Sequence, residues 1–499
     1  MKILSAAQMR EADTFTIKNE SISSLDLMER AAAACAARIA DLTNANSHYL
    51  LFCGKGNNGG DGLAVARLLN QMKRHAEVFV IEHSEKGSED HAANFGRLQK
   101  QGLSKIHSIK KATDLQINEA PNIVIIDALL GTGMNKPIDG VLAETIEKIN
   151  SARLPVISID MPSGLPCDEK PSHKNIVRAS STLTFQRPKF TFFFSENAVY
   201  TGHVEVLDIG LDENFIESQN SNYFVLNEKD IAPLIRPRRK FSHKGLYGHA
   251  LLLAGSKGKT GAAVLAAKAC LRSGAGLLTV HLPSSALSIM QTALPEAMVS
   301  CDENVDIISG VPKNKSFAAI GIGPGIGTEK ETAQALKVLI QNSSVPMVMD
   351  ADALNILAEN KTWISFLAPF TILTPHPKEF DRICGTHTSE MDRLQTCIEF
   401  AQKHQSIVIL KGAFTAVVWP DKKVFFNSTG NPALAKGGSG DVLTGIILAL
   451  LAQGYAPEQA SMLAVFTHGR AADLYIKDHS EMSMLATDLI DLLPQAFLF

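Results

Sequence analysis

Cysteine is scarce in this chain, and what there is lies scattered. The 499 residues include seven cysteines, and no two of them form a C-x-x-C pair. Disulfide frameworks and zinc sites need paired or clustered cysteines, so this pattern predicts reduced thiols and no zinc site. Reduced thiols are typical of the cytosol, and we expect a cytoplasmic protein.

Long apolar runs are also missing. The N-terminal segment becomes polar at once, with Arg10, Glu11 and Asp13, and lacks the apolar core of a signal peptide. The longest apolar stretch, near 446–452, is far too short to cross a bilayer. We therefore expect no targeting segment and no membrane partner.

An excess of charge of one sign is absent as well. Lys and Arg number 48 against 51 Asp and Glu, for a net charge of −3. No global field favours nucleic acid or an anionic membrane, and we expect no nucleic-acid partner. The one basic cluster, 236–240, is interpreted as a solvated linker in preference to a nucleic-acid patch.

What is present is the pattern of an α/β protein of two domains. The length exceeds one typical core, and short apolar runs alternate with amphipathic helical segments. Near-continuous apolar strands, each followed by a helix, predict parallel sheets covered on both faces. Polar residues interrupt the pattern between 210 and 230, so we predict domains at 1–215 and 230–499 and a linker at 216–229.

A glycine-rich loop, 54–62, follows a predicted strand and precedes a helix expected at 63–73. It begins as G-x-G-x-x-G, and Glu82 closes the next strand, which is the pattern of a dinucleotide-binding dehydrogenase. An ordinary tight turn is the structural alternative. However, Asn57, Asn58 and Asp61 make this loop more polar than a phosphate cradle requires, and their oxygens suit a hard cation.

Two further predicted strands in the first half end in aspartate. Asp127 is followed by A-L-L-G-T-G, and Asp160 by M-P-S-G. A single Asp at a strand end is usually a helix cap. Three such ends beside Gly or Ser indicate a shared site, because carboxyl ends of parallel strands meet at one edge of a sheet.

With these motifs, residues 1–215 resemble the NAD(P)H-hydrate epimerase family. The resemblance implies a Rossmann-like three-layer sandwich that interconverts the R and S forms of hydrated NADH or NADPH. It implies a potassium ion held by Asn58, Asp127 and Ser163. It implies substrate contacts from Asn57, Asn58, Gly59, Gly60, Asp61, Gly131, Thr132, Gly133, Met134, Asn135, Lys136, Pro137 and Asp160. The proton-transfer group stays open, with Asp127 and Asp61 as candidates.

The second half carries another glycine loop that ends in aspartate. A basic segment at 255–260 looks like a P-loop, but Leu253 stands where that template needs glycine. In contrast, 437–441 reads G-G-S-G-D at the start of an apolar helix expected at 433–453. Its backbone amides can form an anion pocket, with Asp441 as a general base beside it. A glycine-led helix start capped by Asp is the alternative.

Neighbouring motifs favour the catalytic interpretation. They are G-I-G-P-G at 321–325, D-A-D-A-L-N at 350–355, T-P-H-P-K-E-F at 374–380 and K-G-A-F-T at 411–415. With them, residues 230–499 resemble the ADP- or ATP-dependent NAD(P)H-hydrate dehydratase family of the ribokinase-like three-layer fold. The resemblance implies hydrate contacts from Ala263, Gly325, His376 and Asp441. It implies nucleotide contacts from Lys411, Gly412, Ala413, Phe414, Thr415 and Gly440, with Mg²⁺ accompanying the nucleotide.

The two resemblances together imply a fused repair enzyme, an isomerase in front of a carbon–oxygen lyase. The dehydratase would phosphorylate the ring hydroxyl of the S hydrate, NADHX or NADPHX, and then expel phosphate. ADP is favoured over ATP by resemblance alone, and a homo-oligomer is expected. The alternative is a small-molecule, vitamin-type kinase of the same fold behind a non-catalytic dinucleotide-binding front domain.

Overall fold

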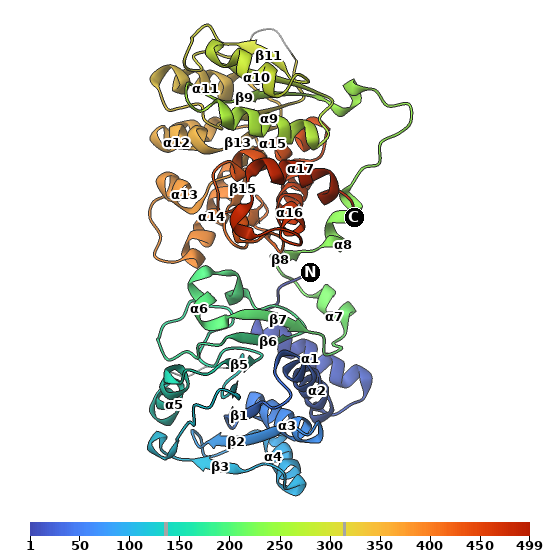
Figure 1. Cartoon of the computed structure of the whole chain (residues 1–499), viewed down its shortest axis with the longest axis vertical. Coiled ribbons are helices and arrows are strands. Elements are labelled where there is room, and N and C mark those ends of the chain that lie inside the picture. The colour runs from blue at the N-terminus through green and yellow to red at the C-terminus, as the bar shows by residue number, and fades with distance from the viewer. Residues whose placement is uncertain (134–137, 313–315) are drawn as a thin grey trace. The chain divides into compact units, whose positions relative to one another are not determined.

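The chain folds into two compact units. The structure, a computed structural model, describes residues 1–133, 138–312 and 316–499. One unit comprises Lys2–Ser221, called here the front unit. The other comprises Asn222–Phe499 together with Met1 and is called the rear unit (Figure 1).

The front unit is built on a seven-stranded sheet in which all neighbouring strands are parallel. The strand order is β3-β2-β1-β4-β5-β6-β7. The order reverses beside β1, so the crevice at the carboxyl ends of β1 and β4 is where such sheets bind ligands. The strands are β1 (His48–Cys53), β2 (His75–Ile81), β3 (Ile106–Ile109), β4 (Ile123–Ala128), β5 (Val156–Ile159), β6 (Ser181–Phe185) and β7 (His203–Leu207).

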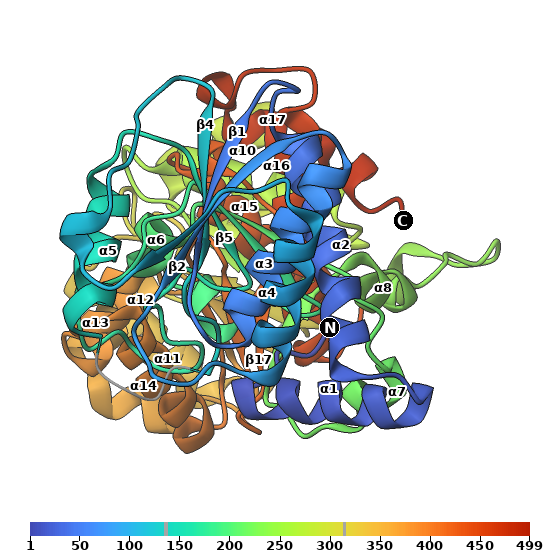
Figure 2. The same cartoon turned by 90° about the horizontal axis from the view of Figure 1, so that it is seen from below.

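Helices cover both faces of this sheet. One core joins one face of β1, β2 and β4 to α2 and α3; the other core joins the opposite face to α5. Figure 2 shows α2, α3 and α4 on one side of the strands and α5 on the other. The helices are α1 (Ala6–Glu20), α2 (Ser24–Leu42), α3 (Asn57–Gln71), α4 (Glu89–Gln101), α5 (Gly140–Ser151), α6 (Ala198–Thr201) and α7 (Glu213–Ser218).

Helix α3 begins six residues earlier than the sequence pattern predicts. Gly56 is its N-cap, and the polar residues from Asn57 onward form its first turns. Here α3 packs so closely on the preceding backbone that a Cβ on Gly59 would lie 1.8 Å from the carbonyl oxygen of Gly54. The glycines therefore permit close packing of helix on strand, and the amides and carboxylate project from the start of a helix.

The rear unit is built on a ten-stranded mixed sheet of order β11-β10-β9-β12-β13-β14-β15-β16-β17-β8. The pairs β15–β16 and β16–β17 are antiparallel, and every other pair is parallel. The strands are β8 (Tyr223–Leu226), β9 (His249–Leu253), β10 (Leu277–Leu282), β11 (Met298–Cys301), β12 (Ala319–Ile322), β13 (Met347–Met349), β14 (Ile372–Leu373), β15 (Ile407–Leu410), β16 (Ala416–Val418) and β17 (Val424–Asn427).

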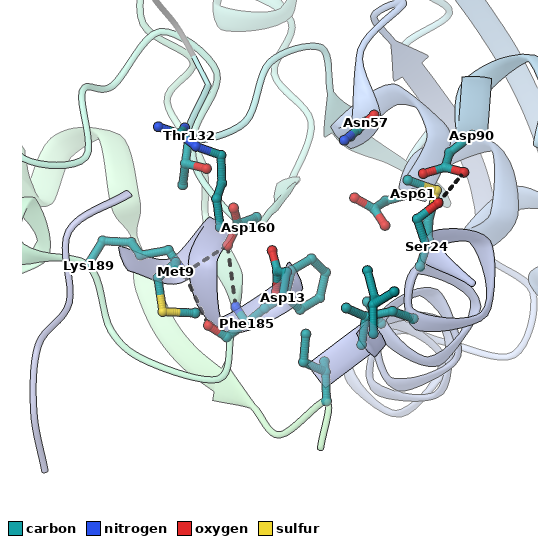
Figure 3. Close-up of a pocket in the computed structure, with 16 residues that line it drawn as sticks. Met9, Asp13, Ser24, Asn57, Asp61, Asp90, Thr132, Asp160, Phe185 and Lys189 are labelled. Atoms are coloured by element: carbon teal, nitrogen blue, oxygen red, sulfur yellow. Dashed lines mark hydrogen bonds and ion pairs between the residues drawn. The ribbon is translucent and has the colours of Figure 1, made fainter. Parts of the chain in front are cut away.

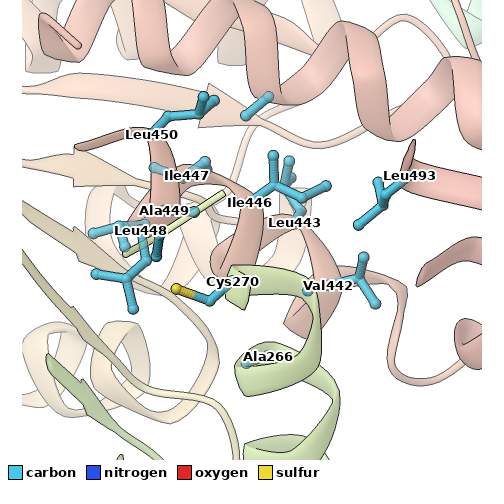
Figure 4. Close-up of a cluster of buried hydrophobic side chains, with 14 of the residues drawn as sticks. Ala266, Cys270, Val442, Leu443, Ile446, Ile447, Leu448, Ala449, Leu450 and Leu493 are labelled. Carbon is cyan, nitrogen blue, oxygen red and sulfur yellow. The ribbon is translucent and has the colours of Figure 1, made fainter. Parts of the chain in front are cut away.

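The largest core of the rear unit lies between this sheet and four helices, α9, α15, α16 and α17 (Figure 4). Helix α15 is buried all round, which explains its continuous apolar sequence. The helices are α8 (Glu228–Ile231), α9 (Thr260–Arg272), α10 (Leu287–Ala293), α11 (Lys330–Asn342), α12 (Ala351–Glu359), α13 (Pro377–Cys384), α14 (Glu390–His404), α15 (Ser439–Ala452), α16 (Pro457–Tyr475) and α17 (Ala486–Ala496).

The segment expected as a linker, 216–229, has regular structure. It holds the end of α7, strand β8 and the start of α8. Strand β8 pairs in parallel with β17, so this segment supplies an edge strand of the rear sheet. Polar turns on both sides of so short a strand hide it from a reading of the sequence.

In the described ranges, no helix has the length and apolarity that crossing a membrane requires.

Candidate functional site

The first candidate site is a cavity of about 190 Å³ in the front unit. Four aspartates line it. Asp90 from α4 accepts a hydrogen bond from Ser24 Oγ, and the other three are Asp13 from α1, Asp61 from α3 and Asp160 directly after β5 (Figure 3). Asn57 and Thr132 line it too, as does the aliphatic and aromatic surface of Met9 and Phe185. The cavity thus combines an apolar wall with several carboxyl groups, which suits a ring that exchanges protons.

Asp160 has an uncommon backbone conformation, and its side chain pairs with a buried lysine. Its φ is +62°, in the left-handed region that a residue with a side chain rarely adopts. Its Oδ1 pairs with Lys189 Nζ at 3.0 Å, and Lys189 also donates to the carbonyl oxygens of Phe185 and Arg187. All three ammonium protons therefore have acceptors, and the ion pair fixes the position of the Asp160 carboxyl group.

The carboxyls of Asp61 and Asp13 are of a different kind. Burial raises the pKa of Asp61 well above its usual range, and the carboxylates of Asp160 and Asp13 raise it further. Burial likewise raises the pKa of Asp13 to about 6. In the described ranges, neither carboxyl accepts a hydrogen bond that would favour its ionised form. The cavity therefore holds one ion-paired carboxylate and two carboxyls that retain protons more readily.

The expected cation ligands Asn58, Asp127 and Ser163 lie close together. Asp127 is fully buried and accepts from Ser158 Oγ (2.8 Å), Leu129 N (3.2 Å), Ser163 N (2.8 Å) and Ser163 Oγ (2.6 Å). Both of its oxygens are therefore occupied, and the carboxyl has no part free for proton transfer to a substrate. This argues against Asp127 as the proton-transfer group.

Asn58 adds an unsatisfied acceptor to this group. Its Nδ2 donates to the carbonyl oxygen of Leu130 at 2.9 Å, and the Leu130 amide donates to Ser163 Oγ. The buried Asn58 Oδ1 has no hydrogen-bond partner in the described part of the chain. A buried amide oxygen is costly without a partner, so this atom fits an oxygen-ligated cation, with Asp127 supplying negative charge.

The remaining predicted residues of the front unit take three positions. Gly59 and Gly60 are buried in the first turn of α3, and Gly133 is exposed. Gly131 and Thr132 line a second cavity of about 760 Å³, which shares Arg10 and Thr132 with the first. Four predicted positions lie outside the described residues, namely Met134, Asn135, Lys136 and Pro137.

Glu82, the acid of the dehydrogenase interpretation, is occupied elsewhere. It pairs with Lys55 Nζ at 2.8 Å and accepts from Ser108 Oγ at 2.9 Å. Asp13 and Lys189, in contrast, line the cavity, and the sequence offers no signal for them. Both lie far from the glycine loop along the chain, and only the fold brings them to it.

The second candidate site is a cavity of about 770 Å³ in the rear unit, with a mostly apolar lining. It is lined by the six residues predicted to contact the nucleotide, which are Lys411, Gly412, Ala413, Phe414, Thr415 and Gly440. His376, predicted to contact the hydrate, lines it too. The loop 427–432 and His468 line it as well, although no sequence motif singled them out. An apolar chamber with a few polar groups at one end suits a nucleoside attached to phosphates.

A buried ion pair lies at the polar end of this cavity. Lys411 Nζ lies 2.9 Å from Asp350 Oδ1 and 3.9 Å from Glu379 Oε2. Burial opposes the charge of Lys411, but the two carboxylates outweigh it and the pKa of the lysine is raised. The other oxygen of Asp350 accepts from Thr444 Oγ1 on α15 at 2.9 Å. Asp350 thus joins the end of β13, Lys411 and the first turns of α15.

Asp441 lies in the first turn of α15 beside this ion pair. Burial raises its pKa to about 7, and the charge of Asp350 adds to the shift while Lys411 opposes it. A carboxyl of this kind is close to half ionised at neutral pH, which is the condition for an effective general base. The glycine N-cap, Gly438, has φ +94° and no side chain that could cap the helix.

His376 is the N-cap of α13, which the sequence did not indicate. Its Nδ1 accepts from the backbone amides of Lys378 and Glu379, so that nitrogen carries no proton. Burial lowers the pKa of His376, and Lys411 adds to the effect. Its other ring nitrogen, Nε2, lies 3.5 Å from Glu379 Oε1.

Ala263 and Gly325 do not line the nucleotide cavity. They lie in the neighbouring group formed by the start of α9 and the loop after β12. A Cβ on Gly325 would lie 3.0 Å from Lys259 Cβ, and Lys259 Nζ pairs with Asp352 at 3.2 Å. Asp352 also acts on the pKa of Asp441. Of the predicted hydrate residues, His376 therefore lies with Lys411 at the nucleotide cavity, whereas Gly325 lies beside Lys259, the partner of Asp352.

The front unit has carboxyl groups around a small, ring-sized cavity, and the rear unit has the Asp441 carboxyl near a nucleotide-sized chamber. These two sites define a two-domain enzyme of nucleotide chemistry. Family models agree with that division. Residues 24–191 match "YjeF-related protein N-terminus" and residues 250–495 match "NAD(P)H-hydrate dehydratase".

Relatives match along nearly the whole chain. The bifunctional NAD(P)H-hydrate repair enzyme of Moorella thermoacetica is 35% identical over 99% of this chain and 96% of its own length. That of Escherichia coli is 33% identical over 89% and 84%. The Bacillus subtilis ADP/ATP-dependent NAD(P)H-hydrate dehydratase, co-crystallised with ATP and Mg²⁺, is 34% identical over 55% of this chain and 97% of its own, with a TM-score of 0.49.

The chain belongs to the family of bifunctional NAD(P)H-hydrate repair enzymes. It is a two-domain enzyme of nicotinamide nucleotide repair, with an epimerase domain in front and a dehydratase domain behind. The alternative interpretation, a vitamin-type kinase with a non-catalytic front domain, is not favoured by these comparisons.

Proposed function

We propose that the rear unit dehydrates the S hydrate of NADH or NADPH at the expense of ADP or ATP, with Asp441 as the general base. The observation that carries this is the position of Asp441. It is a half-buried carboxyl with a pKa of about 7 in the first turn of α15, close enough to Asp350, Lys411 and Asp352 for their charges to shift that pKa. A base of that pKa can accept the proton of a hydroxyl at neutral pH.

Dehydration proceeds by phosphoryl transfer, loss of phosphate and loss of a proton. The hydrate's ring hydroxyl attacks the terminal phosphorus of the nucleotide, the bridging P–O bond breaks, and Asp441 takes the hydroxyl proton. The lone pair of the ring nitrogen then expels phosphate from the neighbouring carbon. Loss of a proton from the next ring carbon restores the double bond of NADH. Phosphate leaves far more readily than hydroxide, which is the chemical reason for using a nucleotide.

Lys411 and the backbone around Gly440 are placed to hold the nucleotide phosphates in this scheme. Lys411 lines the chamber and is kept charged by Asp350 and Glu379. The amides at the start of α15 point toward the same region. The oxygen donors beside Lys411 also suit Mg²⁺ carried by the phosphates, for which it supplies charge neutralisation. Gly412–Thr415 line the apolar chamber where the nucleoside would lie.

In the front unit, we propose epimerisation of the hydrate in the cavity lined by Asn57, Asp61 and Asp160. A potassium ion would use the unpartnered Asn58 Oδ1, with Asp127 and Ser163 completing the oxygen-rich surroundings. The ion would fix the loops that follow β4 and β5 relative to the first turn of α3. A cytoplasmic location and a homo-oligomeric assembly remain predictions from the sequence.

The decisive test supplies purified R and S hydrates, with ADP and ATP in separate reactions, to the full chain. Reduced nicotinamide is followed by absorbance, and the epimer ratio by chromatography. We expect nucleotide-dependent recovery of NADH and, without nucleotide, R–S exchange faster than in buffer. A stable phosphorylated product would instead favour a kinase, and an exchange rate equal to that of buffer would remove the epimerase assignment.

The potassium site has its own test. We expect KCl to raise the thermal midpoint of the front unit's transition above its value in NaCl of equal ionic strength. Asn58→Ala removes the unpartnered oxygen and should abolish the difference between the two salts. Asn122→Ala, at an exposed position, is the control and should retain it. Equal midpoints for the unmodified chain in both salts would argue against a potassium-selective site.

A further inference from the structure

No motif assigns the proton-transfer groups of the front unit, and four carboxyls line its cavity. Asp61 and Asp160 lie on opposite sides of the open space in Figure 3, with Asp13 between them on α1. Asp160 is ion-paired with Lys189, whereas Asp61 has no ion pair among the described residues. Two carboxyls with unlike surroundings, facing each other across a ring-sized cavity, are the arrangement of an acid–base pair.

The chemistry of the substrate requires such a pair. Hydration of the enamine double bond of a dihydronicotinamide puts the hydroxyl on the ring carbon next to the nitrogen. The nitrogen lone pair can expel that hydroxyl if a proton reaches it, which leaves a planar C=N⁺ carbon. Water can then add from either face, and addition to the face opposite the departure inverts the centre.

We propose that Asp61 and Asp160 are this acid–base pair, with Asp61 protonating the hydroxyl that leaves one face and Asp160 deprotonating the water that enters the other. The inference rests on the proposed epimerase function. The C–O bond breaks with its electron pair going to oxygen, and the proton from Asp61 makes the leaving group water. A second water forms the new C–O bond, the C=N⁺ electron pair returns to nitrogen, and Asp160 takes the proton.

The reverse epimer uses the same groups in exchanged roles. After one turnover Asp61 is ionised and Asp160 is protonated, and exchange with solvent water restores the starting state. The surroundings favour that restoration. Lys189 Nζ lies 3.0 Å from Asp160 Oδ1, while burial and the neighbouring carboxylates favour a proton on Asp61. Lys189 is thus a positioning residue that acts through Asp160.

Other charged groups around Asp61 do not take this role. Arg10 and Asp13 come from α1, and Asp90 from α4 accepts a hydrogen bond from Ser24 Oγ at 2.9 Å. Asp13 lies close enough to raise the pKa of Asp61. Its contribution is to favour a proton on Asp61. A variant that lacks the Asp13 charge should therefore have a changed pH profile of R–S exchange but should still catalyse the exchange.

The first test compares variants of the full chain in R–S exchange of purified hydrate. Asp61→Asn and Asp160→Asn should each slow exchange by at least about 100-fold, the range of general acid–base catalysis. Dehydration of the S hydrate by the same preparations should be unchanged, which shows that the chain is folded. Asp41→Asn, exposed on α2, is the matched control and should exchange at the unmodified rate.

Failure of the epimerase function and failure of the acid–base assignment give different results. If the unmodified chain does not accelerate exchange, the epimerase function itself fails. If it does, and either Asp61→Asn or Asp160→Asn retains a rate within a few-fold of it, the assignment of that residue is overturned. Lys189→Met should lower kcat for exchange, because the Asp160 carboxyl loses the ammonium group 3.0 Å away, and Lys189→Arg should restore part of it. An unchanged kcat in Lys189→Met would remove the positioning role.

The second test uses water labelled with ¹⁸O. Departure and re-entry of water predict that each inversion places one solvent oxygen on the hydrate carbon, measured by mass spectrometry against the epimer ratio. Inversion with retention of the original oxygen would instead require ring opening, in which the C–N bond breaks and the C–O bond does not. That result would overturn the proposed steps even if both aspartates proved essential.

Discussion

Asp441 combines two demands that oppose each other. As a base it needs to be ionised, yet its surroundings are buried and include the carboxylate of Asp350. Lys411 offsets part of this cost through its charge. The carboxyl is therefore poised near neutral pH and is a source of local instability, which is common for catalytic groups.

Loss of the Asp441 carboxylate should abolish dehydration selectively. Asp441→Asn removes the base, and we expect dehydratase turnover to fall by about 100-fold or more while R–S exchange is unchanged. In the unmodified chain, kcat/KM for dehydration should fall as the pH drops below about 7, because the base becomes protonated. Retention of full turnover by Asp441→Asn would mean that another group accepts the proton.

The same substitution should stabilise the rear unit at alkaline pH. The folded-state pKa of about 7 exceeds the usual 3.8, so the folded chain binds this proton more tightly than the unfolded chain. The resulting contribution to stability is lost as the pH rises from about 4 to about 7. The thermal midpoint of Asp441→Asn should therefore exceed that of the unmodified chain by roughly a few degrees at pH 8, and by less at pH 5. An equal difference at both pH values would contradict this origin.

Helix α15 contributes both to the candidate site and to the core of the rear unit. Its first turn presents Asp441 and Gly440 to the site, and its remaining length is buried against α9 and the sheet. The approach of α9 is so close that a Cβ on Gly445 would lie 2.2 Å from the carbonyl oxygen of Ala266. Packing along this helix therefore decides where the Asp441 carboxyl is placed (Figure 4).

Gly445→Ala should destabilise the rear unit strongly. The added methyl group overlaps backbone that cannot rotate away, and we expect a loss of about 3 kcal/mol in the free energy of unfolding. Gly261→Ala, in the first turn of α9, is the matched control because its Cβ meets nothing within 4 Å. That variant should be as stable as the unmodified chain or gain up to about 1 kcal/mol. Denaturant titration of both variants measures the difference.

At the scale of elements, the sequence predicts those helices and strands that leave a local pattern of apolar residues or glycines. The apolar run of α15 and the strand ends at Asp127 and Asp160 were predictable, because burial on all sides and parallel pairing leave local signals. The start of α3 inside a glycine loop was not predictable, since the close packing that requires those glycines is tertiary. The role of Lys189 was not predictable either, because its partner Asp160 follows a different strand.

For the whole molecule, each unit contains its own core and its own candidate site. The family resemblance read from the motifs of both halves was confirmed by the full-length relatives. The site residues remain predictions, because no local pattern reports which carboxyl keeps a proton. That property arises from charges contributed by several separate elements, as at Asp61.

Two variants impaired in different units should complement each other in one solution. Asp160→Asn leaves the dehydratase intact, and Asp441→Asn leaves the epimerase intact. We expect either alone to convert R hydrate to NADH slowly, and an equimolar mixture to recover most of the unmodified rate, because the S hydrate can pass between molecules through solvent. Absorbance of NADH measures this. A mixture no faster than its better component would indicate that the hydrate is not released between the two reactions.

Strand β8 has a practical consequence for dividing the gene. A rear fragment that starts at residue 230 lacks Tyr223–Leu226 and bares the edge of β17, including Phe425, against which Phe224 stacks with ring centroids 4.9 Å apart. Unpaired strand edges recruit other strands, so such a fragment should be prone to aggregation during expression. A cut placed before Asn222 keeps the edge covered and is the better starting point for crystallisation of the isolated dehydratase.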